Sequence, residues 1–188
     1  FLSASLLGLG LAVAGLSRHM VLRQAARFYI EVMRGVPIIV LLLYIAFAAT
    51  PAVIIAWNWA TGWTGIDPLR TRDVPLLWRA VAALALAYSA FLAEVFRAGL
   101  QAVDKGQIEA AKALGLTGWQ RFRFVSFPQA FRMILPPLGN DFVAMVKDSS
   151  LVSVLGVTDV TQLGKVTAAG NFRYFETYNV AAFLYLTM

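Results

Sequence analysis

The chain contains no cysteine and few charged side chains. Its 188 residues include one histidine, and only 14% are charged, against about a quarter in ordinary soluble domains. Without cysteine, disulfides, thiolate chemistry and cysteine-ligated zinc are excluded. The sequence also lacks a Gly-x4-Gly-Lys-Ser/Thr phosphate-binding loop and any Ser/His/Asp set arranged for catalysis. It therefore does not predict an enzyme.

Apolar side chains, in contrast, are abundant. They make up 60% of the chain, more than the interior of one soluble domain of this length can hold. The net charge of +6 is spread between apolar segments and forms no single stripe, which argues against a nucleic-acid partner. The composition predicts an integral membrane protein. Because the chain starts without methionine and stops inside an apolar run, we expect a fragment.

A helix that crosses the hydrocarbon core needs about 20 mostly apolar residues. The segments that meet or approach this length are residues 1–17, 35–57, 76–98, 131–155 and 178 onward. We expect the first and last of them to be truncated. The predicted fold class is thus an all-α polytopic membrane protein with about five transmembrane helices, in a single domain over residues 1–188.

Lysine and arginine concentrate in two of the connections. Residues 17–34 hold four arginines against one acidic residue, and residues 97–132 hold six cations against two. The other connections are balanced. The positive-inside rule therefore puts these two in the cytoplasm and the N-terminus outside. Tryptophans cluster near one boundary, as in an interfacial aromatic belt: Trp57, Trp59, Trp63 and Trp78.

The second basic connection, residues 97–132, contains sequence signals for two short helices. Asp104 with Gln107, and Thr117 with Gln120, have the form of capping boxes. Gly115 between them suits the left-handed residue that ends a helix. We predict a short helix, a glycine corner and a second short helix along the membrane surface.

The first of these helices has both an apolar face and small side chains. Ile108, Ala111 and Leu114 can share one face, while Ala110 and Ala113 leave room for another backbone to approach. Composition alone favours an amphipathic surface helix without a partner. Docking against a second protein is the alternative.

A spaced motif in the same loop favours docking. Glu109-Ala110-Ala111 is followed after three residues by Gly115, and nine residues later by Val125-x-Phe127-Pro128. This pattern resembles the EAA loop, here about residues 104–128, of permease subunits of ATP-binding-cassette (ABC) importers. The resemblance implies that the loop docks into a separate ATPase subunit. The residues expected to dock are Gln107, Glu109, Ala110, Ala111, Leu114 and Gly115.

Further stretches, in order from about Arg27 to Arg173, resemble the polar amino-acid branch of these permeases. They are Arg34-Gly35-Val36-Pro37, the third span over residues 87–97, and the fourth span over residues 135–142 and 147–151. Val36 replaces the usual threonine, and the outer loop over residues 57–75 is long.

The resemblance implies a multi-pass protein of the bacterial inner membrane, with the EAA loop in the cytoplasm. Its expected partners are ABC ATPase subunits, an identical or related second permease subunit, a periplasmic or lipid-anchored binding protein, and the amino acid. ATP and Mg would be bound by the ATPase, and no cofactor by this chain. The alternatives are an ion-coupled secondary amino-acid transporter, which has no use for a docking loop, and a membrane scaffold without flux.

Charged side chains interrupt the fourth predicted span. A charge at bilayer depth costs about 2.5–3.5 kcal/mol on insertion scales, so such residues face a cavity or a partner. Asp141 and Asp148 are seven residues apart, on one helical face and about 10 Å apart along the axis. This acidic face would attract an α-ammonium group or a basic side chain. Alternatively, Lys147 neutralises one aspartate and the other caps a helix broken at Pro136-Pro137 or Ser149-Ser150.

The complete predicted substrate set adds polar neighbours and mid-span groups to this pair: Asp141, Asp148, Asn140, Ser149, Tyr88 and Ser89. Helix–helix hydrogen bonding is an equally good reading of the last two. Glu94 and Arg97, three residues apart, are expected to form an intrahelical ion pair. Residues 159–169 are expected to form a short helix closing the outer side.

Overall fold

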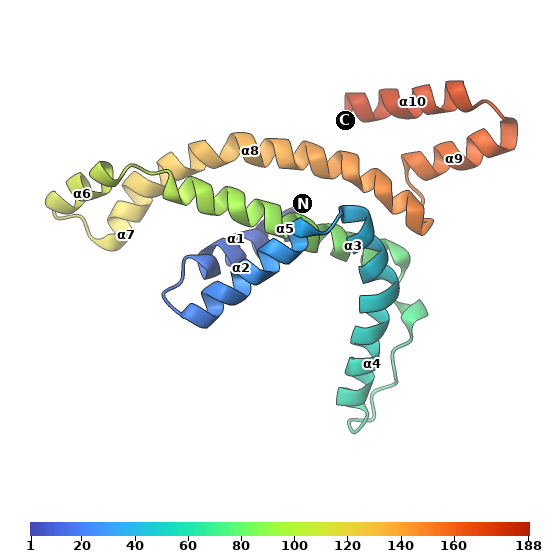
Figure 1. Ribbon diagram of the computed structural model, residues 1–188, viewed down its shortest axis with the longest axis horizontal. Helices are drawn as coiled ribbons and strands as arrows, with labels where there is room; N and C mark the ends of the chain where they lie inside the picture. The colour runs from blue at the N-terminus through green and yellow to red at the C-terminus, as the bar shows by residue number, and fades with distance from the viewer. The chain divides into compact units, whose positions relative to one another are not determined.

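All regular secondary structure in the chain is helical (Figure 1). The computed structural model describes Phe1–Met188 and contains no strand. It divides into two compact units, one of Phe1–Gly35 with Leu86–Val143 and the other of Val36–Ala85 with Ala144–Met188. The all-α prediction is confirmed, while a single domain over residues 1–188 stays a prediction.

Most of the first unit consists of five helices and one π-helical turn. They are α1 (Leu2–Gly15), α2 (Met20–Gly35), α6 (Lys105–Ala113), α7 (Gly118–Arg121), the π turn η3 (Phe122–Ser126), and the part of α8 (Phe127–Asp148) that lies in this unit. The later part of α5 (Leu76–Gln101) completes it. In Figure 1, α5 leads to α6 and α7, and α8 returns alongside α5.

Small side chains bring α1 close to α5. Ala4, Gly8 and Ala12, four residues apart, are all buried. A Cβ atom at Gly8 would lie 2.9 Å from the carbonyl oxygen of Ser89 and 3.1 Å from the backbone nitrogen of Ala93. Such contacts between small residues are a common way to pack membrane helices, because the backbones themselves touch.

The basic stretch before the second span is itself a helix, α2. The sequence predicted only a connection here, because the arginines obscure an amphipathic pattern. Ile30 on its inner face packs with Ala90 and Ala93 of α5. The Tyr29 hydroxyl donates a hydrogen bond to the carbonyl of Leu86 at 3.0 Å. This helix is therefore part of the packed unit.

The second unit contains the remaining helices. They are α3 (Ile38–Tyr44), the π turn η1 (Ile45–Ala49), α4 (Thr50–Thr61), the 3-10 turn η2 (Thr71–Asp73), the start of α5, the end of α8, the 3-10 helix η4 (Ser149–Leu155), α9 (Val160–Asn171) and α10 (Tyr174–Thr187). The Asp159 side chain caps α9 by accepting a hydrogen bond from the Gln162 amide at 2.8 Å. A helix was expected at this position.

Two continuous helical segments are long and apolar enough to cross a membrane. They are Ile38–Thr61, with 24 residues, and Leu76–Gln101, with 26. They match the predicted spans over residues 35–57 and 76–98. The first predicted span forms the shorter apolar helix α1, and the fourth forms α8 and η4.

The predicted break at Pro136-Pro137 is wrong. α8 runs without interruption through both prolines. Proline is tolerated in membrane helices because side chains, water or neighbouring helices can satisfy the freed carbonyls. At Ser149 the α-helix does give way to the 3-10 helix η4, and the Ser149 hydroxyl donates a hydrogen bond to the carbonyl of Val146 at 2.7 Å.

Arg79, near the start of α5, fastens the second unit together, and no sequence pattern predicted this role. Its side chain is 8% exposed. It donates hydrogen bonds to the carbonyls of Val74 at 2.9 Å, Ala46 at 3.0 Å, and Thr71. Ala46 lies in the π turn η1, where the changed hydrogen-bond pattern alters which carbonyls are satisfied within the helix.

We expect Gly8→Ala to destabilise the protein by about 1–3 kcal/mol, because the added methyl group meets the α5 backbone. Gly10→Ala is the matched control on the same helix, since a Cβ there has no atom within 4 Å. Thermal unfolding of the purified complex measures the difference. Equal unfolding midpoints for the two variants would contradict the close packing of α1 on α5.

Replacing Arg79 by methionine keeps the side-chain length but removes every donor. Three carbonyl groups then lose a charged partner, and each such loss costs about 1–3 kcal/mol. We expect a sharp drop in the yield of folded protein on size-exclusion chromatography. The control Arg72→Met, at an exposed position, should leave that yield unchanged.

Candidate functional site

The loop over residues 104–128, here called the coupling loop, has the predicted order of helix, glycine corner and helix. The Asp104 carboxylate caps α6 by accepting a hydrogen bond from the Gln107 amide at 3.1 Å. Thr117 and Gln120 form both bonds of a capping box, at 2.8 and 3.4 Å. Gly115 has a φ of 77°, in the left-handed region where glycine avoids the Cβ clash. The predicted order of helix, glycine corner and helix and the capping box at Thr117 are confirmed, whereas at Asp104 only the bond from the Gln107 amide forms and no complete box.

Most of the predicted docking residues lie on the surface, and one does not. Ala111 is 4% exposed, whereas Leu114 is 81% exposed. The expectation that both share one face with Ile108 is therefore wrong for Leu114. The reason is that α6 ends at Ala113 and the chain turns at Gly115. The exposed members of the set are Gln107, Glu109, Ala110, Leu114 and Gly115.

The other face of α6 belongs to the core of the first unit. A cluster of buried residues, Val103, Ala130 and Ile134, joins the end of α5 to α8. Ile108 of α6 packs against this cluster. A Cβ atom at Gly99 would lie only 2.3 Å from Cγ1 of Ile134, so α5 and α8 are in close contact here. We call Val103, Ala130 and Ile134 the anchor cluster.

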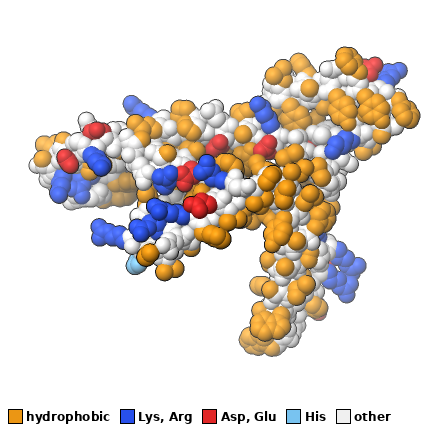
Figure 2. Space-filling view, in the orientation of Figure 1, with side chains coloured by type: hydrophobic (Ala, Val, Ile, Leu, Met, Phe, Trp, Pro, Cys, Tyr) orange, Lys and Arg blue, Asp and Glu red, His pale blue; other side chains and the backbone are white.

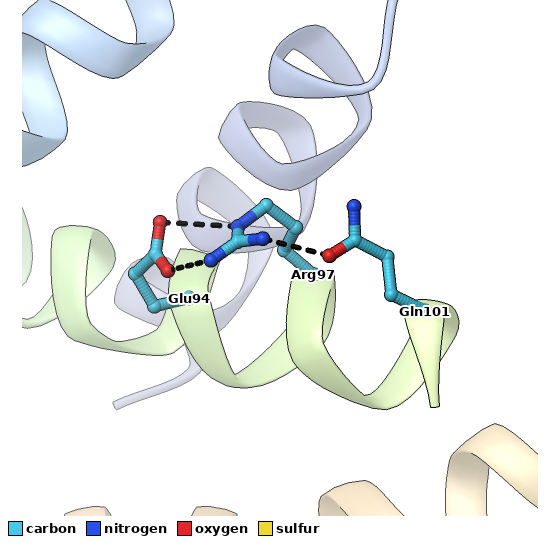
Figure 3. A network of polar contacts seen from close by, with 3 residues as sticks. All are labelled: Glu94, Arg97 and Gln101. Atoms are coloured by element: carbon cyan, nitrogen blue, oxygen red, sulfur yellow. Dashed lines mark hydrogen bonds and ion pairs between the residues drawn. The ribbon is translucent and has the colours of Figure 1, made fainter. Parts of the chain in front are cut away.

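Glu94 and Arg97 form the expected pair within α5 (Figure 3). Arg97 donates from Nε to Glu94 at 3.3 Å and from Nη1 to Gln101 Oε1 at 2.7 Å. Its Nη2 also pairs with the Glu94 carboxylate. The three side chains follow one face of the helix one turn apart. The pair neutralises both charges near the C-terminal end of α5.

Asp141 is a half-buried carboxylate of α8 in the first unit. Its Oδ2 atom is buried and has no hydrogen-bond partner. The Ser5 hydroxyl of α1, which no sequence pattern singled out, is in the same condition. Asp141 precedes Phe142, and Ser5 lies one helical turn after Phe1; the rings of Phe1 and Phe142 meet edge to face, with centroids 5.1 Å apart. A buried polar atom without a partner is costly, so this region can take up a donor.

The mid-span groups of α5 are enclosed by helix packing. Tyr88 is 3% and Ser89 0% exposed. The Ser89 hydroxyl donates to the carbonyl of Leu86 at 2.7 Å and lies 3.1 Å from the Tyr29 hydroxyl. The Tyr88 ring contacts that of Phe91, with centroids 5.9 Å apart. Ser89 thus takes part in hydrogen bonding between α2 and α5.

The remaining predicted substrate residues lie at the surface or at the end of α8. Asn140 is exposed, next to Asp141 in the first unit. Asp148 is the last residue of α8, Ser149 opens η4, and both are half-buried in the second unit. No group of three or more His, Cys, Asp or Glu side chains is arranged to hold a metal ion.

Helices α9 and α10 enclose an open groove in the second unit. Its walls are mostly apolar, and Arg173 and Glu176 add charge. The Tyr185 hydroxyl ties the two helices together by donating to Asp159 Oδ2 at 3.2 Å. Lys165 fastens α9 to η4 by donating to the Ser153 hydroxyl at 3.0 Å. Sequence spacing could not reveal these contacts, since they depend on how the chain turns at Gly156 and at Phe172, both of which have positive φ.

Comparison with known proteins finds a matching family and several similar permease proteins. Residues 4–188 match the family described as "Binding-protein-dependent transport system inner membrane component". The chain is 37% identical to the probable amino-acid permease protein YxeN of Bacillus subtilis, over 95% of this chain and 73% of that protein. It is also 37% identical to the glutamine transport system permease protein GlnP of Escherichia coli, over 87% of this chain and 67% of that protein.

Solved structures agree. A crystal structure of an amino acid ABC transporter with histidines matches with a TM-score of 0.81 and 38% identity, covering 100% of this chain and 79% of that one. The MetNI methionine ABC transporter, at 20% identity, shares the fold with a TM-score of 0.70 over 99% of this chain and 81% of that one. The chain therefore belongs to the binding-protein-dependent inner-membrane transport components, as an ABC importer permease of the polar amino-acid family.

Proposed function

We propose that this chain forms the translocation pathway of an ATP-driven importer of polar amino acids and docks on a separate ATPase subunit through the coupling loop. The observation that carries the proposal is the two-sided character of α6. Gln107, Glu109 and Ala110 are exposed, while Ala111 is buried and Ile108 packs against the anchor cluster. A short helix that is packed on one face and exposed on the other can transmit a displacement from a docked partner to the rest of the protein.

The anchor cluster provides the packing contacts through which that displacement is transmitted. Protein interiors are close-packed and transmit strain, so a displacement of α6 is passed on through Ile108 to α5 and α8. Closure of the ATPase subunits on ATP would then move these helices as rigid bodies and alternate access to the pathway. The ATPase binds ATP and Mg and hydrolyses the ATP, and this chain supplies no catalytic group.

The proposed assembly contains two permease subunits, identical or related, two ATPase subunits and a periplasmic or lipid-anchored binding protein. The coupling loop faces the cytoplasm and the N-terminus lies outside, as the distribution of lysine and arginine predicts. Membership of the ABC permease family does not favour the ion-coupled secondary transporter.

For the substrate, we propose that Asp141 and Asp148 attract the cationic groups of the amino acid, with Asn140 and Ser149 as further contacts. Tyr88 and Ser89 are enclosed by helix packing, so we do not propose them as contacts. The unpartnered Oδ2 of Asp141 supports this role, because a carboxylate in such a place gains most from a cationic donor. The names of relatives include glutamine, L-cystine, octopine and arginine transport. We favour a basic amino acid on the acidic character of these two positions.

The coupling proposal is tested at Ala110, which is exposed on α6. Ala110→Asp places a carboxylate where another backbone must approach, and its desolvation opposes docking. We expect copurification of the ATPase subunit to fall at least about tenfold, with membrane insertion retained. Ile66→Asp, at an exposed outer-loop position, is the control. Undiminished copurification and ATP-driven uptake by Ala110→Asp would contradict the proposal.

The substrate proposal is tested by ATPase stimulation in the reconstituted complex with its binding protein and each amino acid in turn. Asp141→Asn keeps the shape and removes the charge, so a lost charge-assisted hydrogen bond should weaken the apparent affinity for lysine or arginine about 10- to 100-fold. Asp67→Asn, in the outer loop, is the matched control. Equal responses of the two variants would remove Asp141 from the substrate site, without affecting the coupling proposal.

A further inference from the structure

A row of aromatic rings runs from the coupling loop onto α8. Trp119 contacts Phe122 with centroids 5.8 Å apart, Phe122 contacts Phe127 at 5.9 Å, and Phe127 stacks on Phe131 at 5.8 Å. We call these four residues the aromatic ladder. It is continuous over three consecutive elements, α7, η3 and the start of α8.

The π turn η3 keeps the ladder in register. Phe122 and Phe127 are five residues apart, a spacing that would turn them well away from each other on an α-helix. The wider π-helical turn, with its i→i+5 hydrogen bond, brings them together. Such turns occur frequently at functional sites. Here the π turn shapes a surface and not the core, because the rings that it aligns are exposed.

The ladder is not part of the core of its unit. Its rings are between 40% and 67% exposed, whereas Ala130 and Ile134, on the adjacent side of α8, are buried in the anchor cluster. Four exposed rings in contact with one another form an apolar surface, and such a surface marks an interaction site.

The surroundings of the ladder are strongly basic. Residues 110–140 contain no acidic side chain and four cations, at Lys112, Arg121, Arg123 and Arg132. The Arg123 guanidinium lies 5.9 Å from the ring centroid of Phe124. Figure 2 shows hydrophobic and basic side chains side by side over α6 and α7, with acidic side chains among them at this end. The partner of this surface should therefore be both apolar and negatively charged.

We propose that the aromatic ladder and the flanking arginines bind anionic phospholipid at the membrane surface. The rings would lie among the headgroups, as interfacial aromatic residues do, and Arg121 and Arg123 would pair with phosphate. A lipid fits better than a protein because the ladder continues to Phe131, where the predicted fourth span begins. The lipid surface also differs from the proposed docking residues, all of which precede Thr117. The inference needs only the membrane location of the family.

The test measures lipid binding to the purified complex, with fluorescent phosphatidylglycerol and phosphatidylcholine titrated separately. We expect wild type to prefer phosphatidylglycerol. The double variant Arg121→Gln/Arg123→Gln should weaken that binding about 5- to 30-fold, from about 1 kcal/mol per cation. Trp119→Ala removes an exposed ring without changing charge and should weaken it as well. Arg72→Gln/Arg173→Gln, which removes two exposed arginines elsewhere, is the matched control.

Copurification of the ATPase subunit is measured on the same samples. Weakened phosphatidylglycerol binding with unchanged ATPase copurification supports the lipid surface. Phosphatidylglycerol binding equal to that of the control variant overturns it. Loss of the ATPase subunit with lipid binding unchanged also overturns it, and assigns the ladder to a protein interface.

Discussion

The anchor cluster is the contact on which the proposed mechanics depend. Val103, just after α5, packs with Ala130 and Ile134 of α8, and Leu100 of α5 and Ile108 of α6 pack against the same cluster. If α6 were attached only through its two connecting segments, a force on it would bend the loop and leave the spans unmoved. Close packing converts the loop into an extension of two long helices. The exposed side of α6 can then vary with its partner while the anchored side stays constant.

Local codes were the most predictable part of this chain. The caps at Asp104 and Thr117 and the left-handed Gly115 depend on residues within a few positions of one another, so the sequence alone predicts the order of helix, glycine corner and helix in this loop. The two longest spans follow from composition. Leu114 was assigned to the wrong face because its direction depends on where α6 ends, and that end is uncertain by a residue or two in any prediction from sequence.

Features that depend on distant partners could not be predicted in the same way. The hydrogen bonds of Arg79 reach carbonyl groups in η1 and η2 as well as in the turn before α5. No sequence pattern near Arg79 predicts these bonds. Ser5 becomes notable only when its unpartnered hydroxyl is found in the same region of the first unit as Asp141. The sequence also could not predict that α8 continues through Pro136, since this depends on which groups around the helix satisfy the freed carbonyls.

The two π turns have a consequence for how such a chain can change over generations. A π turn accommodates about one residue more than the α-helix that it interrupts, and each further residue rotates the downstream helix by about 100°. Losing one codon within η3 would therefore convert the π turn into an α turn and leave the rings of Phe122 and Phe127 four residues apart, a spacing at which side chains still meet on an α-helix. Gaining one codon there would instead rotate the helix from Phe127 onward by about 100° and turn the aromatic ladder out of line. The spacing between Gly115 and Pro128 is thus more tolerant of shortening by one residue than of lengthening.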